Sequence, residues 1–410
     1  MVVDKRGVVD FDGRDVCEMT FASQQLIPED GVLKSLDIAK REKRRLRIKM
    51  GFDPTSADLH LGHAVPMMQL KRFQEAGHLP VVIIGDFTGR IGDPSGRNKS
   101  RPVVSPEALI RNASTYVDQL GKILDVSDIE IHYNSEWLGG MNLSRLIDIL
   151  SRGSLSQIIS RDDFRKRISS GSTIGLHEII YPYLQGLDSV EVDADIEVGG
   201  IDQLYACQAA RTLQKSYGRR PEALVLTPLL TGTDGSHKMS KSLGNYIGLN
   251  DLPSDMFGKV MSIPDSLIEE YIRLASSFDP QRASEYIRML SEVSSNPMEV
   301  KLDLAYNIVE TYHGSALADQ ALEFFNNQFR KGGKKSYITV EVDKPSSLPD
   351  LLVKIGAAKS RSDARRLIVQ GAVKINSSKV SDIGYTIDSY DNVEVSVGKL
   401  RFYRLVETGR

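Results

Sequence analysis

The pattern of hydrophobic and polar residues predicts a parallel α/β sheet near the start of the chain. Residues 45–50 alternate between polar and apolar, which is typical of a strand, and a loop of turn-forming residues follows. Apolar side chains at helical spacing then predict a helix that ends near residues 75–77. Residues 79–86 are mostly apolar and β-branched, as in a buried parallel strand. The order strand, loop, helix, strand predicts an α/β fold with a doubly wound parallel sheet.

The same patterns divide the rest of the chain. Residues 189–198 alternate as a further strand, which leads into a turn that opens a helix. Five segments are predicted: a mostly helical segment over 1–45, an α/β domain over 46–247 with a helical insertion at about 106–170, an α-helical domain over 248–332, a polar linker over 333–348, and a small α+β unit over 349–410.

Composition and charge limit the cellular compartments and the partners that we expect for the chain. The 410 residues are 41% hydrophobic and 26% charged, and the formal net charge is -2, so any RNA contact must come from local basic patches. The two cysteines, Cys17 and Cys207, lack the spacing of a disulfide framework or a zinc site. Charged residues stand where a signal peptide would be apolar, and the longest apolar run, residues 80–85, is too short to span a bilayer. We therefore expect a cytoplasmic protein with no membrane partner.

Residues 51–63, GFDPTSADLHLGH, place two histidines at the predicted start of a helix. A helix start offers free N–H groups and a positive dipole end, and both suit a phosphate. Gly62, between His60 and His63, leaves no side chain between the backbone and a flat ligand such as adenine. The imidazoles add donors for a phosphoryl group. Taken alone, the motif also fits two surface histidines on a loop, since short motifs recur by chance.

Residues 235–245, GSHKMSKSLGN, combine flanking glycines with Lys238 and Lys241. This composition predicts a mobile loop with cationic tips that could close over a polyphosphate, although alone it also fits a solvated loop. The two stretches together, HLGH after a first strand and KMSKS much later in the same α/β region, resemble the signature of class I aminoacyl-tRNA synthetases.

This resemblance implies a Rossmann-like catalytic domain that binds ATP. His60 and His63 would donate to phosphate oxygens near Thr55, and Lys238 and Lys241 would clasp the pyrophosphate as charge builds in the transition state. Mg²⁺ would bind through the phosphates, with no dedicated protein metal site. The resemblance further implies ATP contacts from Gly51, Asp53, Gly62, Asp202, Met239, Ser240 and Ser242, and cationic side chains at Arg97 and Arg101.

Two further segments resemble tyrosyl-tRNA synthetases specifically. The first is GDPSG at residues 92–96, where a carboxylate beyond a strand end can bind an amine. The second is residues 176–203, in which Tyr181, Gln185 and Asp188 share one face of a predicted helix. Without the resemblance, that stripe also fits hydrogen bonds between helices. The resemblance implies that tyrosine is held by Asp93, Tyr181, Gln185 and Gln203 around its amino group and by Asp188 at its phenolic hydroxyl, with Asp202 facing the ribose.

Two departures concern the choice of amino acid. Lys49 and Met50 stand where many family members have a tyrosine that also touches the phenolic oxygen. Leu187 and Ile201 replace a Tyr and a Thr that are often present. A paralogue that activates a modified tyrosine therefore remains an alternative.

The C-terminal unit carries a basic helix. Ser360 or Ser362 would cap it, and Arg361, Arg365 and Arg366 would lie on its exposed face. With the strands predicted near residues 372–376 and 393–397, the unit resembles an S4 RNA-binding domain, which grips RNA phosphates through this helix. A basic solvated helix is the plain alternative, and a non-catalytic RNA-binding relative is the alternative for the whole chain.

The resemblance covers nearly the whole chain and implies one activity. Tyrosine would be activated with ATP to tyrosyl-adenylate and pyrophosphate, and then transferred to the 3′ end of tRNA(Tyr). The helical insertion around Trp137 would carry part of a homodimer interface. The expected partners are tyrosine, ATP, tRNA(Tyr) and a second copy of the chain.

Overall fold

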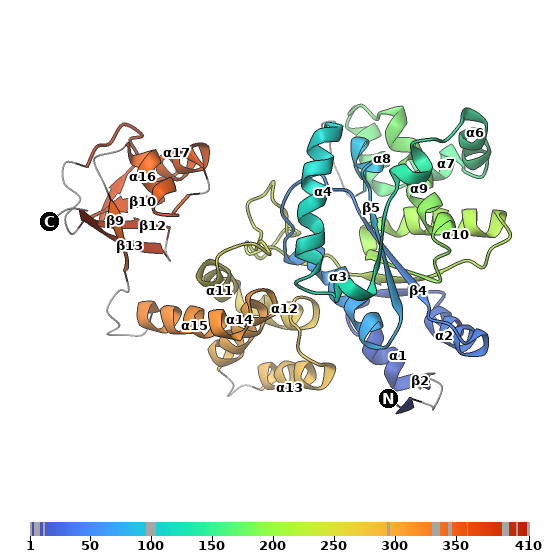
Figure 1. Cartoon of the computed structure of the whole chain (residues 1–410), viewed down its shortest axis with the longest axis horizontal. Coiled ribbons are helices and arrows are strands. Elements are labelled where there is room, and N and C mark those ends of the chain that lie inside the picture. The colour runs from blue at the N-terminus through green and yellow to red at the C-terminus, as the bar shows by residue number, and fades with distance from the viewer. Residues whose placement is uncertain are drawn as a thin grey trace. The chain divides into compact units, whose positions relative to one another are not determined.

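The chain forms two compact units, each built around a sheet of its own. The computed structural model (Figure 1) describes residues 2–3, 9–10, 13–95, 104–292, 296–329, 337–342, 347–358, 360–387, 393–398 and 401–407. One unit comprises Met1–Asn250 and Ile263–Tyr312, and the other comprises Asp251–Ser262 and His313–Arg410.

A six-stranded sheet forms the centre of the first unit. Its order is β3-β8-β7-β4-β5-β6, and every neighbouring pair is parallel except β3 with β8. Figure 1 shows α3 and α4 on one side of this sheet and α9 and α10 on the other, which confirms the predicted doubly wound arrangement. The chain order reverses between β4 and β7, so the carboxyl ends of these strands border a crevice suited to a ligand. The strands are β3 Gln25–Ile27, β4 Arg47–Phe52, β5 Leu79–Ile84, β6 Glu130–Tyr133, β7 Ile196–Gly200 and β8 Ala223–Thr227.

The helices of the first unit bury apolar faces against this sheet and against one another. The predicted helix after HLGH is α3, in which Leu61, Val65 and Leu70 are fully buried. The helices are α1 Gly13–Met19, α2 Gly31–Glu42, α3 Leu61–Glu75, α4 Pro106–Leu120, α5 Ser135–Leu138, α6 Leu143–Ser151, α7 Leu155–Ile159, α8 Asp162–Ser169, α9 Leu176–Glu191, α10 Leu204–Ser216, α12 Ile268–Leu274, α13 Pro280–Ser291 and α14 Pro297–His313. A short pair of strands, β1 Val2–Val3 and β2 Val9–Asp10, precedes them.

Three predictions of secondary structure are wrong in detail. Residues 189–195 are not strand, because α9 continues to Glu191 and packs Val190 into the cluster beneath the helical insertion. Strand β6 lies within the predicted helical insertion, and strand β3 within the predicted helical segment 1–45. Both are short edge strands with polar residues, so their sequences carry little of the apolar signal that marks a buried strand.

The second unit contains a five-stranded sheet in the order β11-β10-β12-β13-β9. Strand β9 pairs in parallel with β13, although it lies inside the predicted linker 333–348, so the sheet begins earlier than residue 349. The helices are α11 Pro253–Met261, α15 Ser315–Phe329, α16 Leu348–Lys354 and α17 Arg361–Val369. The strands are β9 Ile338–Val342, β10 Val373–Ile375, β11 Ser378–Val380, β12 Val393–Val397 and β13 Arg401–Glu407.

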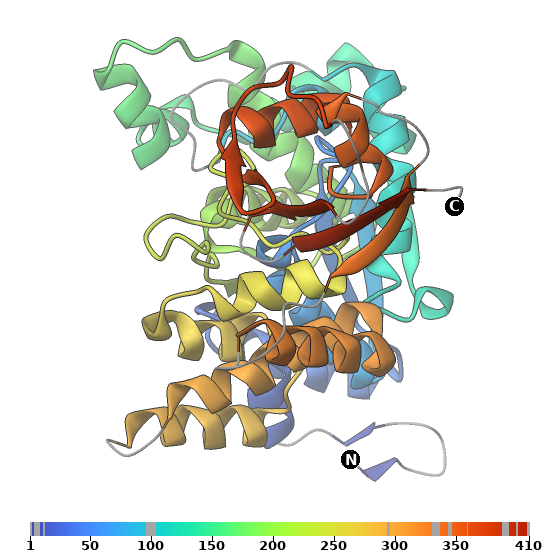
Figure 2. The ribbon, with the colours of Figure 1, turned by 90° about the vertical axis from the view of Figure 1, so that its left-hand side faces the viewer.

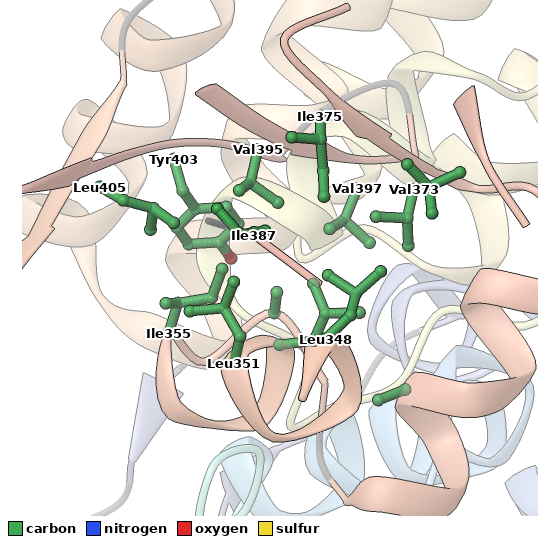
Figure 3. Packing of buried hydrophobic residues seen from close by; sticks show 14 of the residues in the cluster. Leu348, Leu351, Ile355, Val373, Ile375, Ile387, Val395, Val397, Tyr403 and Leu405 are labelled. Carbon is green, nitrogen blue, oxygen red and sulfur yellow. The ribbon is translucent and has the colours of Figure 1, made fainter. Parts of the chain in front are cut away.

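A small apolar core holds this C-terminal sheet to its two helices. Figure 2 shows α16 and α17 together on one face of the sheet. Leu348 and Leu351 of α16 point toward Val395, Val397 and Tyr403 of the strands, and all five are buried (Figure 3). The short helix–sheet sandwich therefore has a hydrophobic core of its own.

Candidate functional site

A pocket of about 570 Å³ opens at the carboxyl ends of β4, β7 and β8. Its wall joins segments that lie far apart in the sequence: the GFDPTSADLHLGH stretch, Asp93, the Gly199–Gln203 turn and the KMSKS loop. The predicted residues that line it are Gly51, Asp53, Thr55, His60, Gly62, His63, Asp93, Asp202, Gln203, Lys238, Met239, Ser240, Lys241 and Ser242. The sheet thus brings most of the residues that are predicted to bind the nucleotide together in one cavity.

The two histidines stand together at the start of α3. The His60 and His63 ring centroids are 3.8 Å apart, and the backbone N–H of His60 donates to Nδ1 of His63 at 3.3 Å. A Cβ on Gly62 would lie 3.1 Å from the His60 ring and 3.5 Å from Cβ of Met239, so only glycine leaves this space open. Burial lowers the pKa of His60 to about 2, and the charges of His63 and Lys241 act in the same direction. His60 is therefore neutral and offers a phosphate one N–H donor.

The chain after KMSKS pairs directly with the HLGH stretch. The backbone N–H of Leu61 donates to the carbonyl of Ile247 at 2.9 Å, and that of Leu249 donates to the carbonyl of Leu59 at 3.0 Å. His60 and Gly248 form an isolated antiparallel bridge. These backbone bonds anchor the base of the lysine loop beside the histidines.

The two lysines of the loop contact acceptors on the pocket wall. Lys238 Nζ lies 3.5 Å from a carboxylate oxygen of Asp202, and their side chains are 43% and 24% exposed. Lys241 Nζ donates to Ser56 Oγ at 3.1 Å and to the carbonyl of Asp58. Partly exposed ion pairs contribute little stability, so the contact with Asp202 can open at little cost. Burial and Asp93 raise the pKa of Asp202, against the charge of Lys238.

Asn245 is a residue of this loop that the sequence predictions missed. Its Oδ1 accepts from the backbone N–H of Ser240 at 2.8 Å, and its Nδ2 donates to the carbonyl of Lys238 at 3.2 Å. The side chain is 4% exposed, and a Cβ on Gly232 would meet its Nδ2 at 2.2 Å. Asn245 therefore fixes the shape of the loop. The available signal was its place at the end of KMSKSLGN.

A chain of hydrogen bonds runs behind the pocket wall from α9 to α5. Tyr181 Oη donates to Asp53 at 3.0 Å, and Thr88 Oγ1 donates to the other oxygen of Asp53 at 2.7 Å. Asn134 Nδ2 donates to Thr88 Oγ1 at 2.9 Å and to Asp188 Oδ2 at 3.3 Å. Burial and Asp53 raise the pKa of Tyr181, so its hydroxyl stays protonated. Asp53, which is predicted to contact ATP, therefore also holds Tyr181, which is predicted to bind tyrosine.

Asp188 ends this chain in a buried position. It is 3% exposed, and Trp137 Nε1 donates to its Oδ1 at 2.9 Å. Burial raises its pKa to about 7, although Lys49, Trp137 and Asn134 lower it. Asn134 and Trp137 were not predicted as site residues, because they lie where β6 meets α5, within the predicted helical insertion.

Some predicted residues lie outside this lining, and Gln203 within it has a further contact. Tyr181 and Asp188 are buried on α9 and Gln185 is partly buried there, but none of the three is among the residues that line the pocket. Gln203 lies against Gly199, where a Cβ would meet its Oε1 at 2.8 Å. Arg97 and Arg101 lie outside the described residues.

The three predicted RNA-binding arginines lie on α17, as predicted. Ser360 caps the helix by accepting from the backbone N–H of Asp363 at 3.2 Å. Arg361 pairs with Asp350, and Arg366 pairs with Asp363 at 2.6 Å. The two arginine side chains are 74% and 66% exposed, so these pairs can exchange for phosphates at little cost.

The described residues offer neither a cluster of metal ligands nor a membrane-spanning helix. They contain no group of three or more His, Cys, Asp or Glu side chains that could hold a metal ion. Within the same residues, every helix is too short or too polar to cross a membrane.

Comparison with known proteins gives consistent matches over almost the whole chain. Residues 40–330 match the family model "tRNA synthetases class I (W and Y)", and residues 328–399 match "Tyrosine--tRNA ligase SYY-like C-terminal domain". The chain is 45% identical over 371 residues to the tyrosine–tRNA ligase of Thermotoga maritima, covering 90% of this chain and 92% of that protein. It is 47% identical over 382 residues to tyrosine–tRNA ligase 2 of Photorhabdus laumondii, covering 92% and 96%.

The fold is also similar to solved structures. A C-terminally truncated mitochondrial tyrosyl-tRNA synthetase of Aspergillus nidulans superposes with a TM-score of 0.62 at 22% identity, covering 76% of this chain and 93% of that chain. At this identity the likeness supports the fold alone.

Proposed function

The chain belongs to the tyrosyl-tRNA synthetase family of class I, and on that basis we propose that it is a tyrosine–tRNA ligase. The observation that carries the proposal is the backbone pairing of the HLGH stretch with residues 247–249, which brings two histidines and two lysines to one pocket. Such a pocket can bind a triphosphate and stabilise the charge that develops on it.

In the first step the tyrosine carboxylate attacks the α-phosphorus of ATP in line, and pyrophosphate leaves. Because no covalent enzyme intermediate is needed, the protein positions the reactants and stabilises charge. His60, neutral and buried, donates to a phosphate oxygen, and His63 and Thr55 lie beside it in the pocket. Asp202 binds the ribose, and its contact with Lys238 breaks. Lys238 and Lys241 then both turn toward the leaving pyrophosphate.

Mg²⁺ accompanies ATP in this proposal and neutralises phosphate charge. It usually keeps several waters and binds through phosphates with few protein ligands.

Asp188 reads the phenolic hydroxyl of tyrosine in this proposal. The Asn134 and Trp137 donors fix its carboxylate, which keeps free lone pairs for one more donor. Phenylalanine would leave the buried carboxylate without that partner, and tyrosyl-tRNA synthetase is itself the usual example of this logic. Tyr181, Gln185, Asp93 and Gln203 are proposed around the amino group.

A paralogue that activates a modified tyrosine gains no support from the departures that suggested it. Leu187 is fully buried in the cluster with Tyr183 and Leu184. Ile201 packs against the cluster of Cys207, Leu224 and Leu226. Both residues therefore fill apolar cores.

Transfer to tRNA and assembly are the further parts of the proposal. Arg361, Arg365 and Arg366 would contact RNA phosphates, which makes tRNA affinity strongly dependent on salt. Leu143 and Leu155, on α6 and α7, are 70% and 57% exposed, which suits a homodimer interface at the helical insertion. The free thiols of Cys17 and Cys207 support the cytoplasm as the compartment.

Amino-acid-dependent exchange of pyrophosphate into ATP tests the activity. Tyrosine should support exchange, and phenylalanine, tryptophan, modified tyrosines and buffer without amino acid should support little. Asp188→Asn should remove most of the preference for tyrosine over phenylalanine. Exchange with a different amino acid, or none with tyrosine, would contradict the proposal.

A further inference from the structure

A fully buried lysine lies directly behind the proposed tyrosine-reading side of α9. Lys49 of β4 is 0% exposed, and its Nζ donates to Glu197 Oε1 and to Ser189 Oγ, both at 2.7 Å. The third acceptor is the backbone carbonyl of Gln185, at 3.5 Å. An ammonium has three N–H donors, and each of them has an acceptor here. Lys49 is therefore held charged and in one position.

The charge of Lys49 is balanced by one of two neighbouring carboxyl groups. Burial alone would raise the pKa of Glu197, but Lys49 beside it holds that pKa below its ordinary value, so Glu197 is ionised. Burial and the Glu197 charge raise the pKa of Glu222 well above its ordinary value, so Glu222 is the neutral member of the two carboxyl groups. Ser189 links Lys49 to Glu222, since its Oγ accepts from Lys49 and donates to Glu222 Oε1 at 3.0 Å.

Lys49 contacts α9 on both sides of Asp188. Ser189 follows Asp188 directly, and Gln185 lies three residues before it. Lys49 is also the main positive charge acting on Asp188, whereas Asp53 acts on it with the opposite sign. The titratable groups around Lys49 and Asp188 are Glu197 of β7, Glu222 before β8, Cys207 of α10, Tyr181 of α9 and Asp53 after β4.

Starting from the role proposed above for Asp188, we propose that the buried Lys49, held in place by Glu197, determines specificity for tyrosine by keeping Asp188 ionised. Asn134 and Trp137 aim N–H donors at both oxygens of Asp188, and the phenolic hydroxyl would be a third donor. A carboxylate accepts all three more strongly than the protonated acid, because protonation turns one oxygen into a donor and weakens it as an acceptor. Lys49 is thus a positioning residue that acts through Asp188.

An electrostatic role and a plain packing role predict different results for paired variants. Lys49→Met removes the positive charge, so Asp188 should ionise only at higher pH. Glu197→Gln combined with Glu222→Gln removes both carboxyl groups beside Lys49 but keeps acceptors for it, so Asp188 should ionise at lower pH; Glu197→Gln alone would let Glu222 ionise in its place. Glu222→Gln is the matched control, because Glu222 is already neutral. Lys49→Arg keeps the charge and should behave most like the unaltered chain.

The experiment measures kcat/KM for tyrosine and for phenylalanine in pyrophosphate exchange, from pH 6 to pH 9, in the full-length chain and each variant. The ratio of the two values cancels the amino and carboxyl groups that both substrates share. In the unaltered chain the ratio should fall as pH drops through about 7, where Asp188 takes up a proton. Lys49→Met should move this fall upward by about one pH unit, which is roughly a fivefold lower ratio at pH 7. The double variant Glu197→Gln, Glu222→Gln should move it downward, and Glu222→Gln alone should leave it in place.

Each outcome decides one point. A ratio lowered at every pH by both Lys49→Met and the Glu197→Gln, Glu222→Gln double variant, without opposite shifts, would overturn the proposal, since damaged packing has no sign. Should Lys49→Met fail to fold, the double variant decides alone: a downward shift supports the proposal and no shift contradicts it. Asp188→Asn with an undiminished tyrosine preference would instead refute the role of Asp188.

Discussion

The two ends of the proposed site are built in opposite ways. At the nucleotide end, Lys238 and Lys241 stand on a loop, and the side chains of Lys238 and its partner Asp202 are 43% and 24% exposed. At the tyrosine end, Lys49 and Glu197 are 0% and 3% exposed and sit on adjacent strands. Exposed pairs exchange partners at little cost, whereas buried charges without partners are strongly unfavourable. The comparison indicates that the lysines at the nucleotide end can follow charge as it develops on the phosphates. At the tyrosine end, a fixed carboxylate recognises the substrate.

The largest expected effect is at the loop end. Lys241→Ala should slow tyrosine activation by about 2–4 kcal/mol, on the order of a hundredfold, because one cation that meets developing charge is lost. Tyrosine affinity should stay nearly unchanged. Stopped-flow measurement of a single turnover checks this. Lys71→Ala is the control, since Lys71 is a lysine on α3 that pairs with Glu75. Near-normal activation in Lys241→Ala would refute its role.

A smaller effect is expected at the buried end. Trp137→Phe keeps an aromatic ring but removes the N–H that donates to Asp188 at 2.9 Å. A hydrogen bond to a charged group contributes about 1.5–3 kcal/mol, so tyrosine binding should weaken by roughly ten- to a hundredfold. Equilibrium dialysis with tyrosine gives the affinity. Tyr133→Phe, at a neighbouring exposed aromatic residue, is the control. Unchanged affinity in Trp137→Phe would mean that Asp188 does not need this donor.

The smallest effect on the pocket should come from the C-terminal unit. Replacing Arg361, Arg365 and Arg366 by glutamine should leave pyrophosphate exchange unchanged, because the described pocket lies wholly in the other unit. The salt dependence of tRNA affinity should flatten by up to about three phosphate contacts. Filter binding over a salt series measures the slope. An unaltered slope would refute the RNA role of α17, and a loss of exchange would link α17 to the pocket.

The sequence predicted the loop end better than the buried end. HLGH and KMSKS are local motifs, and their resemblance to the class I signature implied that His60, His63, Lys238 and Lys241 meet at one site. Asn134 and Trp137 could not be placed in this way, because they reach Asp188 through β6, an edge strand whose polar residues resemble loop. Lys49 is a departure from the family pattern, but the sequence does not show that its partner is Glu197. Glu197 lies on β7, and the strand predicted there begins seven residues too early. Contacts between distant segments carry no local signal.

One measurement tests the division of labour between the two ends most directly. Tyrosine affinity and the single-turnover rate of activation are determined side by side for the unaltered chain, Lys241→Ala and Trp137→Phe. The account predicts a crossed pattern, in which Lys241→Ala lowers the rate at nearly constant affinity and Trp137→Phe lowers the affinity at a nearly constant saturating rate. If both variants change the same quantity by similar factors, the two ends do not divide the work in this way.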